Sequence, residues 1–427
     1  MTLAASLAMI AVGLWVWLIL FRGLYWQDDF TEATEIAAAT DSFAPSQASV
    51  AALPDLVAIL PVFPQMITGY KRTHLLDAGE IDQTRLETAL ANILNQNYPS
   101  SLKLIIVDGV SQGALTGRMT GRMNGEGFTP DGASFAALVR QMAERHMPAS
   151  DTKIVIDEKI RVVPAHLVPA QWSARLWGLS QGLIEAKNFA PTAVYAWFVD
   201  AETEYAPGVL RQLVTIASSE PRDLVSILPA QNCRTTFESL AVPAYGYFFR
   251  LLYPFAWVAD AEHDLAAAGR CVLVRRSSID ALGGLAASFG YNEENALAAA
   301  VKHQGGIRVM LSPLVRQTMM RNRLSEIRQL LASDALIRGE DNPMAQLMTA
   351  LVLLLGFVLP PWFGLFGTGT VSVMGFLAWG AMSLSYIPMI NFYRLSPFWA
   401  VTLPLAATLY LFSLIESMMS RWTRPNK

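Results

Sequence analysis

Charged residues are scarce in this chain of 427 residues. Asp, Glu, Lys and Arg make up 16% of the sequence, whereas they make up about 25% of an ordinary soluble protein. Hydrophobic residues reach 53% and the mean hydropathy is positive, so the composition indicates a membrane protein. The formal net charge is −3. This value excludes a general nucleic-acid-binding function, because neutralising phosphate groups requires a basic surface.

Residues for thiol, zinc and ATP chemistry are also scarce. The two cysteines, Cys233 and Cys271, are too few for a disulfide framework. With five scattered histidines and no CxxC or HExxH motif, they do not form a zinc site either. We expect both to be reduced thiols in the core. No phosphate-binding loop occurs, so ATP-driven chemistry has no support in the sequence.

A long apolar stretch lies near the N-terminus. Leu3 to Phe21 contains no charged residue, and a helix of that length rises roughly 28 Å and crosses a bilayer core. A cleaved signal peptide is the competing interpretation, because small residues follow at Ala37 to Ala39, but the stretch is long and no Lys or Arg precedes it. Arg22 follows directly, with Tyr25 and Trp26 at interface depth. The positive-inside rule therefore predicts that the next part of the chain lies in the cytoplasm.

Three more apolar runs lie toward the C-terminus. A strict count of four spans that starts outside would leave Arg421, Arg424 and Lys427 on the outer side, against the positive-inside tendency. Pro360 and Pro361 interrupt the first run, so a re-entrant or kinked segment at these prolines is the simplest explanation. The three runs are Leu347 to Phe366, Val371 to Ile390 and Phe398 to Ile415.

Between the anchor and these runs, short β-rich apolar segments alternate with helix-like stretches. This alternation predicts an α/β domain built from βαβ units with a mostly parallel sheet. The piece from Gly113 to Gly132 has no clear period and is predicted to be a loop. The clearest strands are Leu56 to Leu60, Leu104 to Val107, Lys153 to Ile156, Ala196 to Val199 and Leu224 to Leu228. The predicted helices are Asp82 to Asn95, Ser134 to Arg145, Ala174 to Ala186 and Pro207 to Ser218.

One segment of this domain, Phe237 to Val258, is rich in aromatic residues. It is broken by Pro243 and Pro254 and carries Arg250, so it is too interrupted to span a membrane. It is either a buried core helix or an interfacial helix in the lipid headgroups, where aromatic residues and a snorkelling Arg are favoured. We favour the interfacial helix, beside a lipid-entry site.

Acidic residues stand at the ends of predicted strands, where an open α/β sheet binds its ligands. Asp108 ends the strand LIIV, and Asp200 ends the strand AWFV, two residues before Glu202. The segment YNEEN supplies Glu293 and Glu294 further along the chain. Two carboxylates in an alternate-residue pattern can bind one hard cation, and Mg²⁺ or Mn²⁺ shared with a diphosphate would use this geometry. A D-x-E tripeptide by itself also occurs on solvated strand ends.

Six segments in a fixed order carry a family resemblance: ILNQNYPSSLKLIIVDGVS, WSARLWGLSQG, WFVDAETEYAPGVLRQLV, FESLAVPAYGYFFRLLYPFAWV, AAAGRCVLVRRSSIDALGG and NEENALAAAVKHQGG. With these, nearly the whole chain resembles the membrane-bound hopene-associated glycosyltransferases of bacterial hopanoid gene sets. That family belongs to glycosyltransferase family 2 and has the GT-A fold. LLYPFAWV and AAAGRCVLVRR are the most specific segments, because they go beyond what all family 2 enzymes share.

The resemblance implies roles for five residues. Asp108 matches the first acid of the family's strand-end pair and would contact the nucleotide base. Asp200 and Glu202 match the two ends of its DxD motif, so that Asp200 would hold ribose or diphosphate through the metal and Glu202 would ligate the metal directly. Arg175, in WSAR, would pair with phosphate and, with the metal, stabilise the leaving diphosphate. Glu294 would be the general base that removes the proton of the acceptor hydroxyl in an inverting transfer.

The chain also departs from the family pattern. Where the family usually reads PARNE, this chain reads PVFPQ at Pro61 to Gln65, and Gly109 replaces the second acid of the strand-end pair. Glu202 and Glu294 stand where the family has Asp, and a misplacement near 1 Å can cost on the order of 100-fold in rate. An extra segment, Met66 to Gln83, has no counterpart. The departures support a second interpretation, a divergent and catalytically inactive GT-A-fold protein that acts as a lipid-pathway scaffold or binding protein.

Together these features predict a multi-pass protein of a bacterial inner membrane whose central domain faces the cytoplasm. It would transfer a sugar from a nucleotide sugar, with a UDP-sugar the usual donor in this fold, to a hopanoid or similar polyisoprenoid lipid. The predicted parts are an N-terminal anchor at 1–22, a GT-A domain at 23–343 with the aromatic segment at 237–258, and C-terminal membrane helices at 344–427.

Overall fold

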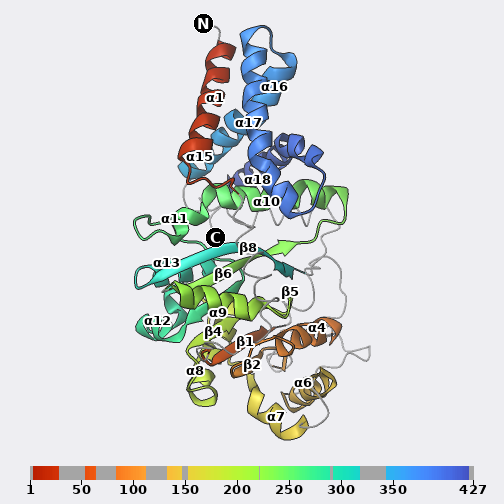
Figure 1. Cartoon of the computed structure of the whole chain (residues 1–427), viewed down its shortest axis with the longest axis vertical. Coiled ribbons are helices and arrows are strands. Elements are labelled where there is room, and N and C mark those ends of the chain that lie inside the picture. Colours follow the sequence, from red (N-terminus) through yellow and green to blue (C-terminus); the bar gives the residue numbers. More distant parts are fainter. Residues whose placement is uncertain are drawn as a thin grey trace, which may run out of the picture. The chain divides into compact units, whose positions relative to one another are not determined.

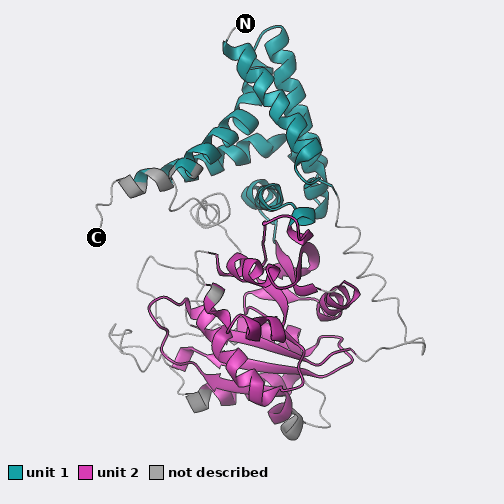
Figure 2. Cartoon of the chain, turned by 90° about the vertical axis from the view of Figure 1, so that its left-hand side faces the viewer, with its two compact units in different colours: residues 1–29, 231–257, 320–427 teal, residues 30–230, 258–319 magenta. Residues whose placement is uncertain are grey.

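The computed structural model divides the chain into two compact units, coloured separately in Figure 2. Unit 1 comprises Met1–Asp29, Gln231–Trp257 and Met320–Lys427, and unit 2 comprises Phe30–Ala230 and Val258–Met319. The structure describes residues 3–27, 53–63, 83–111, 132–146, 152–220, 222–288, 292–317 and 343–422.

Unit 2 is built on a mixed sheet of eight strands in the order β3-β2-β1-β4-β7-β6-β8-β5 (Figure 1). One half is parallel: β1 pairs with β2 and β4, and β2 pairs with β3. In the other half β7 pairs antiparallel with β4 and β6, and β5 pairs antiparallel with β8. The strands are β1 (Leu56–Val62), β2 (Leu102–Asp108), β3 (Ile160–Pro164), β4 (Tyr195–Phe198), β5 (Thr203–Tyr205), β6 (Arg222–Gln231), β7 (Cys271–Arg275) and β8 (Gly306–Gln317).

The α/β class is therefore confirmed, and the sheet is mixed rather than mostly parallel. The parallel half holds the alternating strands and helices from which the prediction was made. β7 lies between β4 and β6 although it comes after β6 in the sequence, so its antiparallel pairing depends on contacts between residues far apart in the chain.

Helices cover both faces of the parallel half. The even-numbered residues of β1 belong to one hydrophobic cluster with residues of α4, α6 and α9. The odd-numbered residues face α8, which comes very close because Gly178 and Gly182 present no side chain: a Cβ at Gly182 would collide with Ile59. Every residue of β1 is buried as a result. The helices of unit 2 include α4 (Gln83–Leu94), α6 (Gly132–His146), α7 (Thr152–Lys159), α8 (Ala174–Phe189), α9 (Val209–Ser219), α12 (Arg276–Ala281) and α13 (Glu293–Lys302).

Four of the five predicted strands occur, and the one at Lys153 to Ile156 is wrong. That segment lies within α7, and the strand of this region is the next element, β3. A run of three apolar residues is too short for its period to separate helix from strand. Gly113 to Gly132 and the insertion Met66 to Gln83 lie, except for their last residues, outside the described residues.

Among the residues that the structure describes, unit 1 contains four helical segments that are long and apolar enough to cross a membrane: Leu3–Phe21, Gln346–Phe366, Thr370–Phe392 and Pro397–Glu416. All four predicted apolar runs are thus helical. Their elements are α1 (Leu3–Phe21), α15 (Pro343–Leu353), the π-helical stretch η3 (Leu354–Val358), α16 (Leu359–Phe366), α17 (Thr370–Phe392), η4 (Pro397–Thr402) and α18 (Leu403–Trp422). How many of them cross stays a prediction.

The prolines of the second apolar segment directly follow the π-helical stretch, in the first turn of α16. Pro360 and Pro361 have no N–H to donate, so the carbonyls one turn earlier lack their usual helical partners. The indole Nε1 of Trp15 in α1 donates to the carbonyl of Gly356, at 2.7 Å. The tryptophan thus replaces the donor that Pro360 removes, and it joins α1 to this segment.

The aromatic segment forms α10 (Thr236–Leu252), which lies in unit 1, and α11 (Phe255–Ala259), which begins in unit 1 and ends in unit 2. A capping box of Thr235 and Glu238 starts α10. The hydroxyl of Tyr247 lies 2.8 Å from that of Tyr25 and 2.7 Å from that of Ser385 in α17. α10 is thus packed against the apolar helices, and its place in the headgroups stays a prediction.

Arg250 differs from the expectation of a snorkelling side chain. It is buried within unit 1, its Nη2 donates to the carbonyl of Gln27 at 2.7 Å, and its guanidinium carbon lies 5.2 Å from the centre of the Phe255 ring. The neighbouring Arg22 donates to the carbonyls of Leu251 and Leu252 at the end of α10. Both arginines therefore tie the aromatic helices to the segment after α1.

Candidate active site

Asp108 lies at the end of β2 and is held by its own turn. Its Oδ1 accepts from the backbone N–H groups of Val110 at 2.9 Å and Ser111 at 3.1 Å, and the Ser111 hydroxyl donates to Oδ2. The carboxylate is 1% exposed. These bonds fix its orientation at the carboxyl edge of the parallel strands, where the sequence predicted a ligand contact.

Asp200 follows β4, and its carboxylate meets two arginines. Oδ2 accepts from Nη1 of Arg270 at 2.9 Å and lies 3.8 Å from Nε of Arg175. Oδ1 accepts from the backbone N–H of Glu202 at 3.1 Å. Asp200 is 2% exposed. Burial alone would raise the pKa of this carboxyl, but Arg270 and Arg175 hold the pKa below its ordinary value of 3.8.

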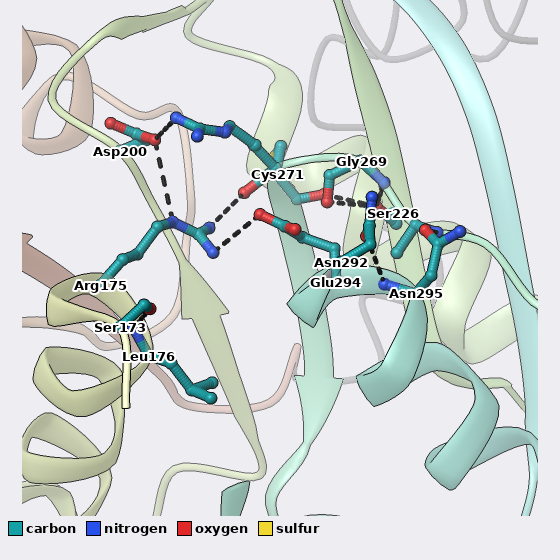
Figure 3. A network of polar contacts seen from close by, with 12 residues as sticks. Ser173, Arg175, Leu176, Asp200, Ser226, Gly269, Cys271, Asn292, Glu294 and Asn295 are labelled. Atoms are coloured by element: carbon teal, nitrogen blue, oxygen red, sulfur yellow. Dashed lines mark hydrogen bonds and ion pairs between the residues drawn. The ribbon is translucent and has the colours of Figure 1, made fainter. Parts of the chain in front are cut away.

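Arg175 lies between Asp200 and Glu294 and contacts both carboxylates (Figure 3). It lies in the first turn of α8, whose N-cap is Ser173. Its Nη1 donates to Oε1 of Glu294 at 2.9 Å, and its Nη2 donates to the carbonyl of Arg270 at 3.3 Å. Within the part of the chain that the structure describes, its buried Nε has no hydrogen-bond partner.

Glu293 and Glu294 begin α13 and point to different partners. Glu294 pairs with Arg175, whereas the side chain of Glu293 bonds that of Ser173. Burial raises the pKa of Glu293; the bond from Ser173 opposes the shift, and the charge of Glu294 adds to it. Adjacent helical residues diverge by about 100°, which explains why the two carboxylates meet different groups.

The residues predicted as metal ligands lie against a guanidinium group. Nη1 of Arg270 is 3.9 Å from Oε2 of Glu202, besides its bond to Asp200. Among the described residues, no group of three or more His, Cys, Asp or Glu side chains could hold a metal ion. Two oxygen ligands compensated by an arginine do not fit a preformed Mg²⁺ or Mn²⁺ site, which draws most of its ligands from carboxylates, carbonyls and water.

Phe63 explains the replacement of the second strand-end acid by Gly109. A Cβ at Gly109 would collide with the ring of Phe63, and a Cβ at Gly178 would collide with the same ring. Phe63 comes from the PVFPQ segment, the other place where the chain departs from the family pattern. Both differences from the family that the sequence resembles therefore concern one place, where the ring of Phe63 fills space that a side chain at residue 109 would need.

The site thus unites four of the five residues predicted from the sequence: Arg175, Asp200, Glu202 and Glu294. The contacts of Asp108 given above stay within its own turn. Sequence reasoning missed the roles of Arg270 and Phe63. The only signal for Arg270 was its place in the specific segment AAAGRC, because a lone arginine before a strand has no distinctive pattern.

A motif of hydrolases also occurs in α8, where Gly178 to Gly182 reads G-x-S-x-G. A nucleophile elbow requires its serine on a sharp turn between a strand and a helix. Ser180 instead lies inside a regular helix, and the two glycines serve the close packing on β1. The motif therefore does not indicate a nucleophilic serine.

No protein-family model matches the sequence, and no curated protein matches it. Among solved structures, the mannosyltransferase PcManGT from Pyrobaculum calidifontis, in complex with GDP-Man and Mn²⁺, is similar with 14% identity over 98% of this chain and 100% of that one, at a TM-score of 0.49. TarS 1–349 from S. aureus has 11% identity over 87% and 93%, at 0.33. Glucosyl-3-phosphoglycerate synthase from Mycobacterium tuberculosis, in complex with phosphoglyceric acid, has 14% identity over 70% and 82%, at 0.33. Identities this low concern the fold alone.

Proposed function

We propose that the chain is a membrane-bound inverting glycosyltransferase that moves a sugar from a nucleotide sugar to a lipid. The observation that carries the proposal is the network of buried Asp200, buried Arg175 and partly exposed Glu294 at the carboxyl edge of an α/β sheet. It combines a cation that suits a diphosphate with a carboxylate that suits a hydroxyl. The described part of the chain also contains four helices that are long and apolar enough to cross a membrane.

Donor binding would use the edge of the parallel strands. Asp108 would contact the nucleotide base and Asp200 the ribose or diphosphate, as the family resemblance implies. Arg175 supports a phosphate contact on its own, because its buried Nε lacks a hydrogen-bond partner among the described residues. A guanidinium group presents its N–H donors in a fork that matches phosphate oxygens.

Glu294 would supply the base of the chemical step. Its carboxylate takes the proton of the acceptor hydroxyl while the hydroxyl oxygen forms a bond to the anomeric carbon of the sugar. The bond between that carbon and the diphosphate oxygen breaks, and the nucleoside diphosphate leaves with the electron pair. One carboxylate is sufficient for this displacement, and Arg175 stabilises the charge that develops on the leaving diphosphate.

The acceptor would be a hopanoid or a similar polyisoprenoid lipid, reached in the bacterial inner membrane from a cytoplasmic catalytic domain. The helices of unit 1 support membrane association by their length and composition. The contact of Tyr247 in α10 with Ser385 in α17 supports a position of the aromatic segment beside these apolar helices. The identity of the lipid rests on the family resemblance alone.

The negative charge of the diphosphate requires a positive partner. The family resemblance implies Mg²⁺ or Mn²⁺ at Asp200 and Glu202, whereas the structure offers Arg270 and Arg175 in that region. Titrating UDP into the protein with and without EDTA tests the metal. Equal UDP affinity in both conditions would mean that donor binding does not require a divalent cation.

The second candidate is an inactive scaffold or binding protein of a lipid pathway. The observation that favours it is the ring of Phe63, which fills the space of the second strand-end acid. Incubating the purified full-length chain with UDP-sugars, Mn²⁺ and membrane lipids separates the two functions. Sugar transfer that disappears in Glu294→Gln supports the enzyme, whereas nucleotide binding without transfer or hydrolysis would support the scaffold.

A further inference from the structure

Arg270 stands where the sequence predicts a metal ion. Its Nη1 lies 2.9 Å from Asp200 Oδ2 and 3.9 Å from Glu202 Oε2, so one guanidinium group faces both predicted metal ligands. A divalent cation would need the same oxygens at about 2.0–2.6 Å. Arginine and metal therefore compete for the same carboxylates.

The backbone fixes the position of Arg270. β4 and β7 are antiparallel with Phe198 opposite Val272, and continuing this register by two residues sets Arg270 opposite Asp200. The buried hydroxyl of Ser226 in β6 holds the backbone directly before β7. It accepts from the N–H of Gly269 at 2.8 Å, and it lies 3.2 Å and 3.0 Å from the carbonyls of Gly269 and Cys271. The pairing of the strands therefore fixes the position of Arg270 opposite Asp200.

A ligand from solvent can reach Arg270. Its side chain is 46% exposed, whereas that of Arg175 is 8% exposed. The two arginines are also linked, because the carbonyl of Arg270 accepts from Nη2 of Arg175. Arg270 thus offers a partly exposed, permanently charged fork of N–H donors, with Arg175 beside it, and such a pair is suited to a diphosphate.

We propose that Arg270 is the resident cation of the donor site, which neutralises Asp200 and Glu202 and, with Arg175, binds the diphosphate of a nucleotide without a divalent metal ion. This rests on the proposed function only for the nature of the ligand. Three carboxylates (Asp200, Glu202 and Glu294) share two arginines in the network, so removing Arg270 leaves one arginine for all three. The variant site therefore favours a divalent cation.

The first experiment measures Mn²⁺ binding without nucleotide, by electron paramagnetic resonance on the full-length chain. Arg270→Ala should bind Mn²⁺ at least about tenfold more tightly than the wild-type protein, and Arg270→Lys, which keeps the charge, should resemble the wild type. Arg140→Ala is the matched control, because Arg140 pairs with Asp157 at the surface of unit 2. Equal Mn²⁺ affinity of the wild type and Arg270→Ala would overturn the role of Arg270 whether or not a nucleotide binds.

The second experiment titrates UDP by calorimetry. Wild-type affinity should be the same within about twofold with EDTA or with Mn²⁺, and Arg270→Ala in EDTA should bind about 10- to 100-fold more weakly, the loss of a charge-assisted hydrogen bond. Arg270→Lys should retain more of the affinity than Arg270→Ala. UDP binding by the wild type that is lost in EDTA would overturn the metal-free proposal, while the proposed function would stand. No UDP binding in any condition would overturn both.

Discussion

Arg175 donates to Glu294 over 2.9 Å, and this ion pair joins the first turns of α8 and α13, whose residues are 119 positions apart in the sequence. The same guanidinium group is the proposed partner of the donor diphosphate. Under the proposed function, a bound diphosphate would compete with Glu294 for Arg175. The pair would therefore couple donor binding to the carboxylate that acts as the base.

Glu294→Gln should abolish transfer, because removing a general base slows the chemical step by roughly 100- to 10,000-fold. UDP affinity should not fall and should rise modestly, since the neutral glutamine competes less with the diphosphate for Arg175. Glu293→Gln is the control, and its transfer rate at saturating donor should stay within about tenfold of the wild type. Near-normal transfer by Glu294→Gln would exclude this base, and a severe loss in Glu293→Gln alone would move the role to Glu293.

Arg175→Gln should destabilise the protein, because it leaves Asp200 and Glu294 without a cation that both contact. Breaking a buried pair costs about 3–5 kcal/mol, and the partial exposure of Glu294 places the expected loss at the lower end. Arg140→Gln, which breaks the exposed pair with Asp157, should cost at most about 1 kcal/mol. Denaturant unfolding of both variants measures the difference, and equal losses would contradict the structural role of Arg175.

The stabilising effect of Asp200 should depend on pH. The pKa of Asp200 in the folded protein lies below its ordinary value of 3.8, so the folded state favours the ionised form. Its contribution to the free energy of unfolding is complete well above pH 4 and is lost as the pH falls through the folded pKa. The stability gap between wild type and Asp200→Asn, measured by unfolding from pH 7 to pH 3, should therefore narrow toward low pH. A gap that is constant or widens would mean that Asp200 does not act through its charge.

Phe63 and residue 109 should be coupled. Gly109→Asp introduces a side chain where the ring of Phe63 lies, and such overpacking costs about 1–3 kcal/mol, with a further cost for a buried charge. Phe63→Ala alone should also be destabilising, because the ring is buried. In the double variant the losses should be less than additive by about 0.5–3 kcal/mol. If thermal unfolding shows that the two single losses add up to the loss of the double variant, the two side chains are not in contact.

The central domain should lie in the cytoplasm. Lys187→Cys adds a thiol on the surface of unit 2, where Lys187 is paired with Asp280 and 61% exposed. A membrane-impermeant maleimide should leave it unlabelled in intact spheroplasts and label it after lysis, and a reporter at the N-terminus should indicate the outer side. Labelling in intact spheroplasts would exclude cytoplasmic nucleotide sugars as donors.

The sequence alone predicted the elements whose signal is local. The apolar run from Leu3 to Phe21 has a length that a bilayer requires, and it is a helix. Asp108 and Asp200 end short apolar strands, so their positions at the carboxyl edge followed from the alternation of strands and helices. The strand predicted at Lys153 to Ile156 failed because three apolar residues carry no period of their own.

Only the tertiary structure decided what faces these carboxylates. Arg270 reaches Asp200 through the antiparallel register of β7 against β4, a pairing of residues 70 positions apart that no local pattern encodes. Phe63 excludes a side chain at residue 109 because the parallel register of β1 against β2 sets the two residues side by side. Composition and periodicity therefore fix which segments become helices and strands, whereas strand order and register determine which charges meet, and those meetings set the chemistry of the site.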